Sequence, residues 1–344
     1  MQKHSRRSFV SGMALSGLTA GGLVDIPLLG ASSAMAQTGS GRGLLLGVNF
    51  AGAEFNAIGG RWHWPKLDNL QYYLGKGFRI FRIPFLWERL QPQLHGELDN
   101  DALSGLETIL GMLEQAGAIA LLDAHNYGRR QGQIIGDPGS PVDIGAFADF
   151  WGRMGARYRS RRLVWYNLMN EPHSQDPQTN LMAQNAACRA IRAAGATTKV
   201  LFSGIAWTGG HSWISSGNGQ VMLGARDPAN NYAFDVHQYL DKGFGGSSEI
   251  AIPGVGAHIL TAVYQWASAN GKKIFLGEFG TGPSPASVAE LHAMIDFMAA
   301  HQDVFIGGTM FAGGGTWGRN PKSADPIDGV DKPQTMLLRQ YFNR

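Results

Sequence analysis

The chain has 344 residues, of which 44% are hydrophobic and 16% are charged. This composition is too apolar for a disordered protein, and the length suits one large domain or two smaller ones. The formal net charge is only +3, with no stripe of lysine or arginine, which argues against a nucleic-acid-binding protein. The single cysteine, Cys188, excludes an intramolecular disulfide and is interpreted as a helix packing residue rather than a catalytic thiol.

The N-terminal residues have the features of an export signal. Twin arginines, Arg6 and Arg7, precede a mildly apolar segment that ends in small residues before a cleavage site after Ala36. Residues 1–36 are therefore predicted to be a twin-arginine-type signal peptide, and the protein to be periplasmic or secreted. Glycine, aspartate and proline interrupt the segment, so it lacks the roughly 20 consecutive apolar residues of a membrane span. No membrane anchor is expected after cleavage.

Eight short apolar runs follow along the chain, and each is expected to form a β-strand. They begin at Gly43, Gly77, Ala118, Leu163, Lys199, Tyr232, Lys273 and Phe305. The spacing leaves room for a helix after each strand, because one strand–helix unit needs about 30 residues.

Apolar residues at three- and four-residue steps predict helices between these strands. The predicted helices cover residues 64–77, 99–117, 143–158, 180–196, 254–271 and 284–302. The second opens with three candidate N-cap residues, Asp99, Asn100 and Asp101. Residues 208–230 have only a weak helical signal and are expected to be mostly loop.

Strands that are apolar at nearly every position belong to a parallel sheet covered on both faces. Eight of them, most followed by a helix, predict a (β/α)8 TIM barrel of the α/β class that forms one domain over residues 37–344. A doubly wound sheet is the alternative, but the first strand is not followed by its glycine fingerprint.

Polar and aromatic residues collect where the predicted strands end. The chemistry of a TIM barrel lies at the carboxyl ends of its strands, so these residues are the candidate site. They are Arg82, Asp123, His125, Asn126, Asn170, Glu171, His237, Tyr239, Glu278, Phe311 and Trp317.

Glu171 and Glu278 end the fourth and seventh strands and are expected to face each other across the barrel mouth. Two carboxyls that flank a bond suit glycoside hydrolysis, because one can protonate the departing oxygen while the other attacks or stabilises the anomeric carbon. A separation of about 5–5.5 Å gives retention of configuration, and about 6.5–9.5 Å gives inversion.

Other interpretations of the polar residues remain open. Arg82 within an apolar strand needs a buried partner, either in a structural ion pair or with a catalytic carboxylate. His125 and His237 are either site residues or core histidines. A metal site built from Asp123 and these two histidines lacks the usual ligand spacing, so neither a metal nor an organic cofactor is expected.

Five motifs in order resemble those of glycoside hydrolase family 5, the large cellulase family, and in detail its fungal-type endoglucanase subgroup, which has bacterial relatives. The motifs are FRIPFLWERLQP, LLDAHNYG, VWYNLMNEPH, DVHQYLD and FLGEFG, and the resemblance covers residues 43–311. It implies a retaining endo-β-1,4-glucanase that acts on a β-glucan polysaccharide, with a monomer expected.

The resemblance also implies roles for individual residues. Glu171 resembles the acid/base and Glu278 the nucleophile that forms a covalent glycosyl-enzyme. Asn170 is similar to the asparagine that binds the sugar 2-hydroxyl, and Arg82 and Tyr239 to the pair that orients the nucleophile. The other residues implied in substrate binding are His125, Asn126, His237, Phe311 and Trp317.

Aromatic residues are expected to line the cleft. Phe311 stands where the family usually has a tryptophan platform; it is smaller and lacks the indole N–H, and Trp317 is expected to take part of that role. Further cleft candidates are Trp62, Trp64, Trp87, Trp207 and Trp213, with packing as the alternative for Trp87 and Trp207.

Three alternative functions are retained. A related β-glycanase could act on mannan, xyloglucan or mixed-linkage glucan, since these motifs do not separate the substrates. A catalytically inactive carbohydrate-binding barrel is favoured only by Phe311. A metal-dependent hydrolase would lose activity with a chelator.

Overall fold

The computed structural model describes residues 43–55 and 62–342, which belong to one compact unit. The predicted signal peptide, residues 1–36, lies outside the described residues. None of the described helices combines the length and the apolar character needed to cross a lipid bilayer.

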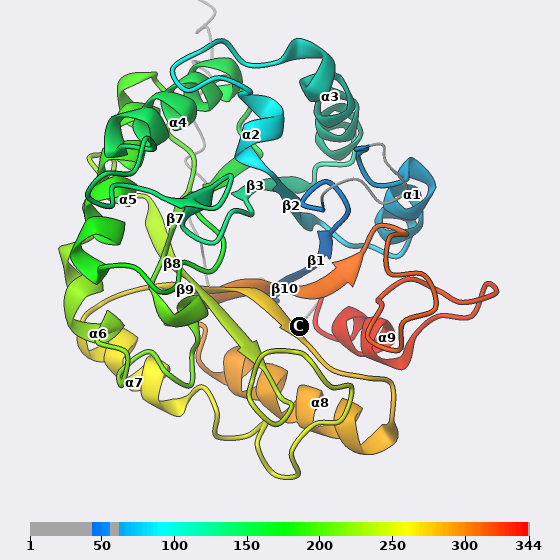
Figure 1. Ribbon diagram of the computed structural model, residues 1–344. Coiled ribbons are helices and arrows are strands. Elements are labelled where there is room, and N and C mark those ends of the chain that lie inside the picture. Colours follow the sequence, from blue (N-terminus) through cyan, green and yellow to red (C-terminus); the bar gives the residue numbers. More distant parts are fainter. Residues whose placement is uncertain (1–42, 56–61, 343–344) are drawn as a thin grey trace, which may run out of the picture. The chain divides into compact units, whose positions relative to one another are not determined.

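Eight parallel strands close into a barrel, with helices outside it (Figure 1). The strands follow one another around the ring in chain order, and the last pairs with the first. All eight predicted strands and the TIM-barrel fold are confirmed. The barrel strands are β1 (Leu45–Phe50), β2 (Ile80–Phe85), β3 (Ile119–Ala124), β6 (Val164–Asn167), β7 (Val200–Ser203), β8 (Tyr232–Tyr239), β9 (Ile274–Gly280) and β10 (Phe305–Gly313).

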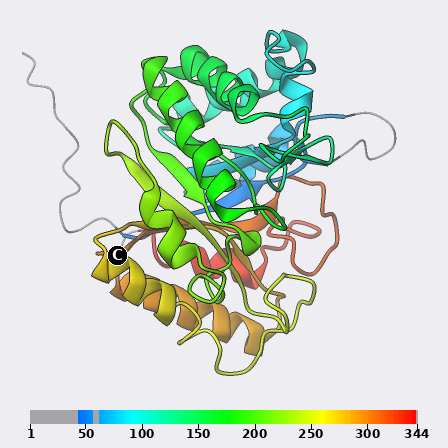
Figure 2. The same cartoon turned by 60° about the vertical axis from the view of Figure 1, so that its left-hand side comes forward.

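The six predicted helices are present, and Figure 2 shows several of them from the side of the barrel. They are α1 (Leu67–Gly75), α3 (Asn100–Gln115), α4 (Ile144–Tyr158), α5 (Pro177–Ala193), α7 (Thr261–Ala269) and α8 (Pro285–Ala300). α7 begins at Thr261 rather than at residue 254.

Shorter elements complete the described fold. Between β7 and β8 there is only the short helix α6 (Asn218–Val221) with the 3₁₀ turns η2 (Ala206–Thr208) and η3 (Met222–Gly224), as the weak helical signal indicated. Sequence patterns did not predict α2 (Trp87–Leu90), α9 (Pro333–Arg339) or the β4 (Arg129–Arg130) and β5 (Gln133–Ile134) ribbon.

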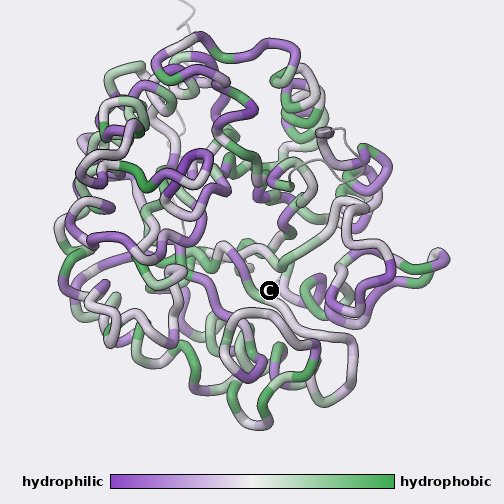
Figure 3. Tube along the Cα trace, in the orientation of Figure 1, coloured by the Kyte–Doolittle hydropathy of each residue, from purple (hydrophilic) through white to green (hydrophobic). Residues whose placement is uncertain are grey.

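Side-chain caps and one-sided burial explain why the longer helices form where they do. Asp99 accepts a hydrogen bond from the Ala102 amide at 3.0 Å, which satisfies an unpaired donor of the first turn of α3 and confirms one predicted N-cap. Hydrophobic and hydrophilic stretches alternate along the helices in Figure 3, as expected for helices that turn one face to the barrel. Cys188 is fully buried in α5, which confirms its packing role.

The barrel interior changes from apolar to polar along the strands. Near the strand starts, Ile80, Leu121, Leu201, Ala233 and Phe275 form one apolar cluster. Two residues further along most strands, and therefore on the same face, the interior is polar. This polar layer is fully buried and consists of Asn49, Arg82, Asp123, Asn167, Ser203, Asp235 and Thr309. It forms the floor beneath the strand ends.

Candidate active site

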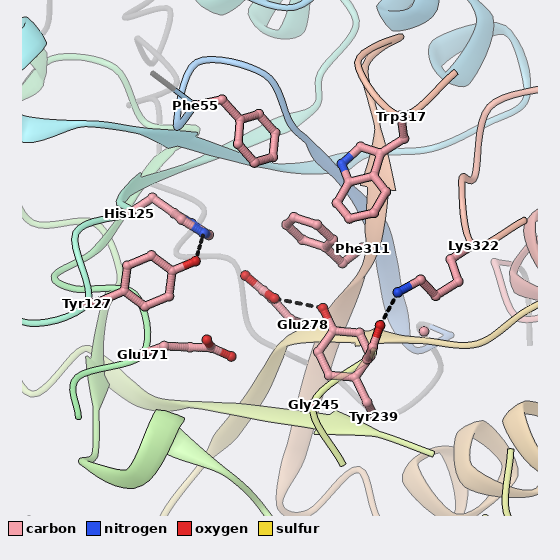
Figure 4. A pocket seen from close by; sticks show the side chains of 12 residues that line it. Phe55, His125, Tyr127, Glu171, Tyr239, Gly245, Glu278, Phe311, Trp317 and Lys322 are labelled. Carbon is pink, nitrogen blue, oxygen red and sulfur yellow. Dashed lines mark hydrogen bonds between the residues drawn. The ribbon is translucent and has the colours of Figure 1, made fainter. Parts of the chain in front are cut away.

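Glu278 lies on β9 directly above the polar layer and is 5% exposed. Its Oε1 accepts a hydrogen bond from Arg82 Nη1 at 2.8 Å. Its Oε2 accepts one from the Tyr239 hydroxyl at 2.8 Å, as Figure 4 shows. Burial alone would raise the pKa of Glu278, but the positive charges of His237 and Arg82 outweigh it and hold the pKa below its ordinary value. Glu278 is therefore an ionised, firmly oriented carboxylate at neutral pH.

Glu171 lies just beyond β6 and points into the same space from the opposite side (Figure 4). Its φ of 41° is in the left-handed region, which residues other than glycine rarely adopt and which is often found at functional sites. Its Oε1 lies 2.8 Å from His237 Nδ1, and the ligand-type atoms of Glu171, His237 and Glu278 all lie within 4.8 Å of one another. The two predicted carboxyls therefore meet.

His237 stands between the two carboxyls. Its Nδ1 is 2.8 Å from Glu171 and 3.7 Å from Glu278, and its Nε2 is 3.2 Å from Asp235. Burial works to lower the pKa of His237, but the charges of Glu278 and Asp235 prevail and raise it to about 10. His237 is thus an imidazolium at neutral pH that donates to Glu171.

Arg82 is fully buried in the floor and joins three site residues. Besides Glu278, its guanidinium donates to Asn170 Oδ1 at 2.7 Å and lies 3.0 Å from Asp123. Burial would lower the pKa of Arg82, but the negative charge of Asp123 and Glu278 raises it. Arg82 is therefore a positioning residue that lines neither of the two cavities described below.

Asn170 and His125 continue this network. Because the Asn170 carbonyl faces Arg82, its amide Nδ2 is the end that donates to His125 Nε2, at 3.1 Å. His125 Nδ1 in turn faces Asp123 at 2.8 Å. Asn170 is fully buried, so its predicted contact with a sugar hydroxyl stays a prediction.

The prediction that Asn126 binds substrate is corrected by the structure. Its Oδ1 accepts from the Trp87 amide at 2.8 Å, and its Nδ2 donates to Glu88 at 2.7 Å. Asn126 holds the start of α2 and lines neither cavity, because its side chain turns back toward the chain after β2.

The first cavity has a volume of about 250 Å³ and contains both carboxyls. Phe311 and Trp317 line it as predicted, their rings perpendicular at 5.4 Å, and Phe311 stacks against His125 at 6.4 Å. Figure 4 shows Phe55 and Trp317 on the side of the cavity away from Glu171.

A second cavity of about 470 Å³ adjoins the first and shares only Glu171 and Gly245 with it. Trp207 lines it, is 53% exposed, and stacks on His173 with a centroid distance of 4.8 Å and an angle of 14°. His211 and Phe244 also line it, and their rings lie 4.5 Å apart. The two cavities therefore form a groove with Glu171 at the junction.

Of the other tryptophans proposed for the cleft, Trp87 and Trp213 are fully buried in the core and are corrected to packing residues. Trp62 and Trp64 pack against the core, and their indole N–H groups donate to backbone carbonyls. Neither tryptophan lines either of the two cavities. The burial of each side chain decides its role, because a tryptophan in a loop can turn toward the core or toward the groove.

The sequence patterns missed several cavity residues, and four of them illustrate why. Phe55 and Tyr127 follow β1 and β3 closely, so the strand-end rule could have included them. Phe244 follows β8 at the same spacing as Phe55 follows β1, so the same rule could have included it. Lys322 lies further along the loop after β10, where no local signal marks it. Lys322 donates to the Gly246 carbonyl and lies 5.7 Å from the Trp317 ring centre, which links two loops beside the cavity.

Within the described chain, Glu171, His237 and Glu278 are the group whose spacing could hold a metal ion. With a pKa of about 10, His237 holds a proton on both ring nitrogens at neutral pH, and a metal ion would have to displace one of these protons to bind there. The alternative set of Asp123, His125 and His237 is not brought together as one group. The residues fit proton transfer better than metal binding.

A TIM barrel with two carboxyls across one groove defines the class of this protein as a glycoside hydrolase. The family model of the cellulases, glycosyl hydrolase family 5, matches residues 47–312. The chain belongs to this family, as the motifs indicated.

Similar proteins agree with this classification. Endo-beta-1,4-glucanase B of Aspergillus niger is 33% identical over 291 residues, which cover 83% of this chain and 86% of that protein. The crystal structure of an endo-beta-1,4-glucanase from Xanthomonas axonopodis pv. citri has a TM-score of 0.83 at 36% identity, covering 88% of this chain and 99% of that one. XacCel5A, solved in complex with cellopentaose, has the same TM-score and identity over 87% and 99% of the two chains.

Proposed function

We propose that this protein is a retaining endo-β-1,4-glucanase that hydrolyses internal bonds of cellulose or a soluble β-glucan. The observation that carries the proposal is the meeting of Glu171 and Glu278, whose nearest oxygens lie within 4.8 Å. This spacing is nearer to the roughly 5–5.5 Å of retaining enzymes than to the roughly 6.5–9.5 Å of inverting ones, which supports retention.

In the first step, an oxygen of Glu278 attacks the anomeric carbon, and the bond from that carbon to the glycosidic oxygen breaks. Glu171 gives its proton to the departing oxygen, so the leaving chain departs as a neutral alcohol. Arg82 and Tyr239 hold the Glu278 carboxylate in place for the attack. The product of this step is a covalent glycosyl-enzyme on Glu278.

In the second step, Glu171 removes a proton from a water molecule as that water attacks the same carbon. The bond to Glu278 breaks, its carboxylate is regenerated, and Glu171 carries a proton again. The His237 imidazolium donates to Glu171 and balances the carboxylate that forms there in the first step. Two inversions at one carbon give net retention.

The shape of the groove is consistent with a polymeric substrate that binds in one direction. Glu171 must contact the leaving oxygen, so the second cavity, which contains Glu171 but not Glu278, takes the leaving part of the chain. The exposed ring of Trp207 offers that part an apolar face. The names of the relatives and the cellopentaose complex of XacCel5A support a β-1,4-linked glucan as substrate.

The test compares Glu171→Gln and Glu278→Gln with Glu97→Gln, a control on an exposed glutamate. Both site variants should lose at least about 99.9% of activity on carboxymethylcellulose while the control keeps full activity, and all three should stay folded at the assay temperature. ¹H NMR of the first product should show the β-anomer. Full activity in either site variant, or the α-anomer first, would refute the mechanism.

A substrate panel tests the specificity. Carboxymethylcellulose, mannan, xyloglucan and mixed-linkage glucan are compared by kcat/KM, and the proposal expects the unsubstituted β-1,4-glucan to be preferred. Preference for mannan or xyloglucan would reassign the enzyme within the same mechanism. Saccharide binding with no release of reducing sugar would instead indicate an inactive binding barrel.

We also propose that the protein acts as a monomer after export through the twin-arginine pathway. The support is the sequence of residues 1–36, with Arg6 and Arg7 ahead of the apolar segment. Replacing both arginines by lysine should keep the protein in the cytoplasm, and the exported form should begin after Ala36. Export of the double variant at the parent's level would refute this route.

A further inference from the structure

Glu54, in the loop that follows β1, is a third buried carboxyl beside the first cavity. It is only 6% exposed, and it directly precedes Phe55, which lines the cavity wall. Its Oε2 accepts a hydrogen bond from the Gly52 amide at 2.5 Å. Its Oε1 is buried and has no hydrogen-bond partner among the described residues. The mechanism above gives this carboxyl no role.

The surroundings of Glu54 favour the neutral acid. A carboxylate oxygen buried without a donor costs several kcal/mol unless the group takes up a proton. The titratable groups that act on Glu54 from neighbouring elements are His125 and Tyr127 after β3 and Glu278 on β9. Burial raises the pKa of Glu54 to about 7. A charge on His125 and backbone hydrogen bonds from Gly52 and Glu54 oppose this effect, and the negative charge of Glu278 adds to it.

The loop that carries Glu54 is connected to the other aromatic wall of the cavity. The Ala51 amide donates to the Gly313 carbonyl at 2.9 Å, and the Thr316 hydroxyl donates to the Ala51 carbonyl at 3.3 Å. The rings of Phe55 and Trp317 lie 6.5 Å apart, edge to face. A rearrangement around Glu54 would therefore displace both rings.

We propose that Glu54 is a positioning residue whose neutral acid form keeps Phe55 and Trp317 in place, and that its ionisation moves this wall and releases the sugar chain. The Gly52 amide serves only Oε2 of an ionised Glu54, so residues 51–55 must shift for water to reach the buried Oε1. The sugars bound on the Glu278 side of the groove lose their stacking contacts as a result. The binding of a β-glucan oligomer then requires a protonated Glu54, and this inference rests on the proposed function.

Calorimetric titration with cellopentaose tests the inference, in a Glu171→Gln background that prevents hydrolysis. The dissociation constant should be constant below about pH 6 and rise about tenfold per pH unit above about pH 8, because only the protonated form binds. Measured in buffers of different ionisation enthalpy at pH 8, binding should take up close to one proton. Adding Glu54→Gln, which keeps the shape of the neutral acid, should abolish both effects.

Several results would overturn the inference. They are a constant affinity from pH 5 to 9, binding at pH 8 without proton uptake, or proton uptake that persists when Glu54→Gln is added. Binding at pH 8 without proton uptake would overturn the inference with no change made at Glu54, so the inference stays falsifiable even if that variant fails to fold. Failure of cellopentaose to bind even at pH 5 would overturn the proposed function, and this inference with it.

Discussion

Replacing Arg82 with methionine is predicted to destabilise the fold in a pH-dependent way. The guanidinium is fully buried and contacts Asp123 at 3.0 Å and Glu278 at 2.8 Å, so its removal takes a buried counter-charge away from two buried carboxylates. Removing one partner of a buried ion pair lowers the free energy of unfolding by about 3–5 kcal/mol. For a domain of this size, this corresponds to a fall in Tm on the order of 10 °C.

The sign of the pH dependence follows from Glu278. In the parent, the pKa of Glu278 is lowered, so its contribution to stability is present above the ordinary carboxyl pKa and lost as pH falls through the lowered value. Without Arg82, the pKa of Glu278 rises, and the variant relieves its buried charge by taking up a proton at acidic pH. The difference in unfolding free energy should therefore be larger at pH 7 than at pH 4.

Urea unfolding of the parent, Arg82→Met and Arg82→Lys at both pH values measures this difference. Arg82→Lys keeps a positive charge but lacks the planar fork that reaches several partners, so it should lose less stability than Arg82→Met. Adding Glu278→Gln to Arg82→Met should recover part of the loss, because one unpaired charge is gone. A loss below about 1 kcal/mol at pH 7, or an equal loss at both pH values, would refute the reasoning.

Three further predictions concern the groove, the floor and the question of a metal. Trp207→Ala should raise KM on soluble β-glucan about fivefold with little change in kcat, because it removes one stacking surface from the leaving side, and a loss confined to kcat would contradict this. Gly277→Ala should lower both Tm and activity, since its Cβ would lie within bonding distance of Asp235, and an unchanged thermal transition would contradict this. Activity should be unaffected by dialysis against EDTA, because His237 is protonated on both nitrogens, and a loss restored by Zn²⁺ would show a metal role.

The sequence by itself determined the barrel, its eight strands and the two glutamates. Buried parallel strands are apolar at nearly every position, and this local pattern is visible in the sequence without any knowledge of tertiary contacts. Glu171 and Glu278 were identifiable because a carboxyl directly after an apolar run has to lie at a strand end, where the barrel places its chemistry.

Only the tertiary structure decided what each side chain contacts. Asn126 stands one residue after His125, yet its amide holds the start of α2. Trp213 is core whereas Trp207 is exposed on the groove, although both follow the same strand. Whether the buried Oε1 of Glu54 has a hydrogen-bond partner depends on which donors the fold brings near it. Side-chain direction and partner choice arise from residues far apart in the chain, so no local pattern contains them.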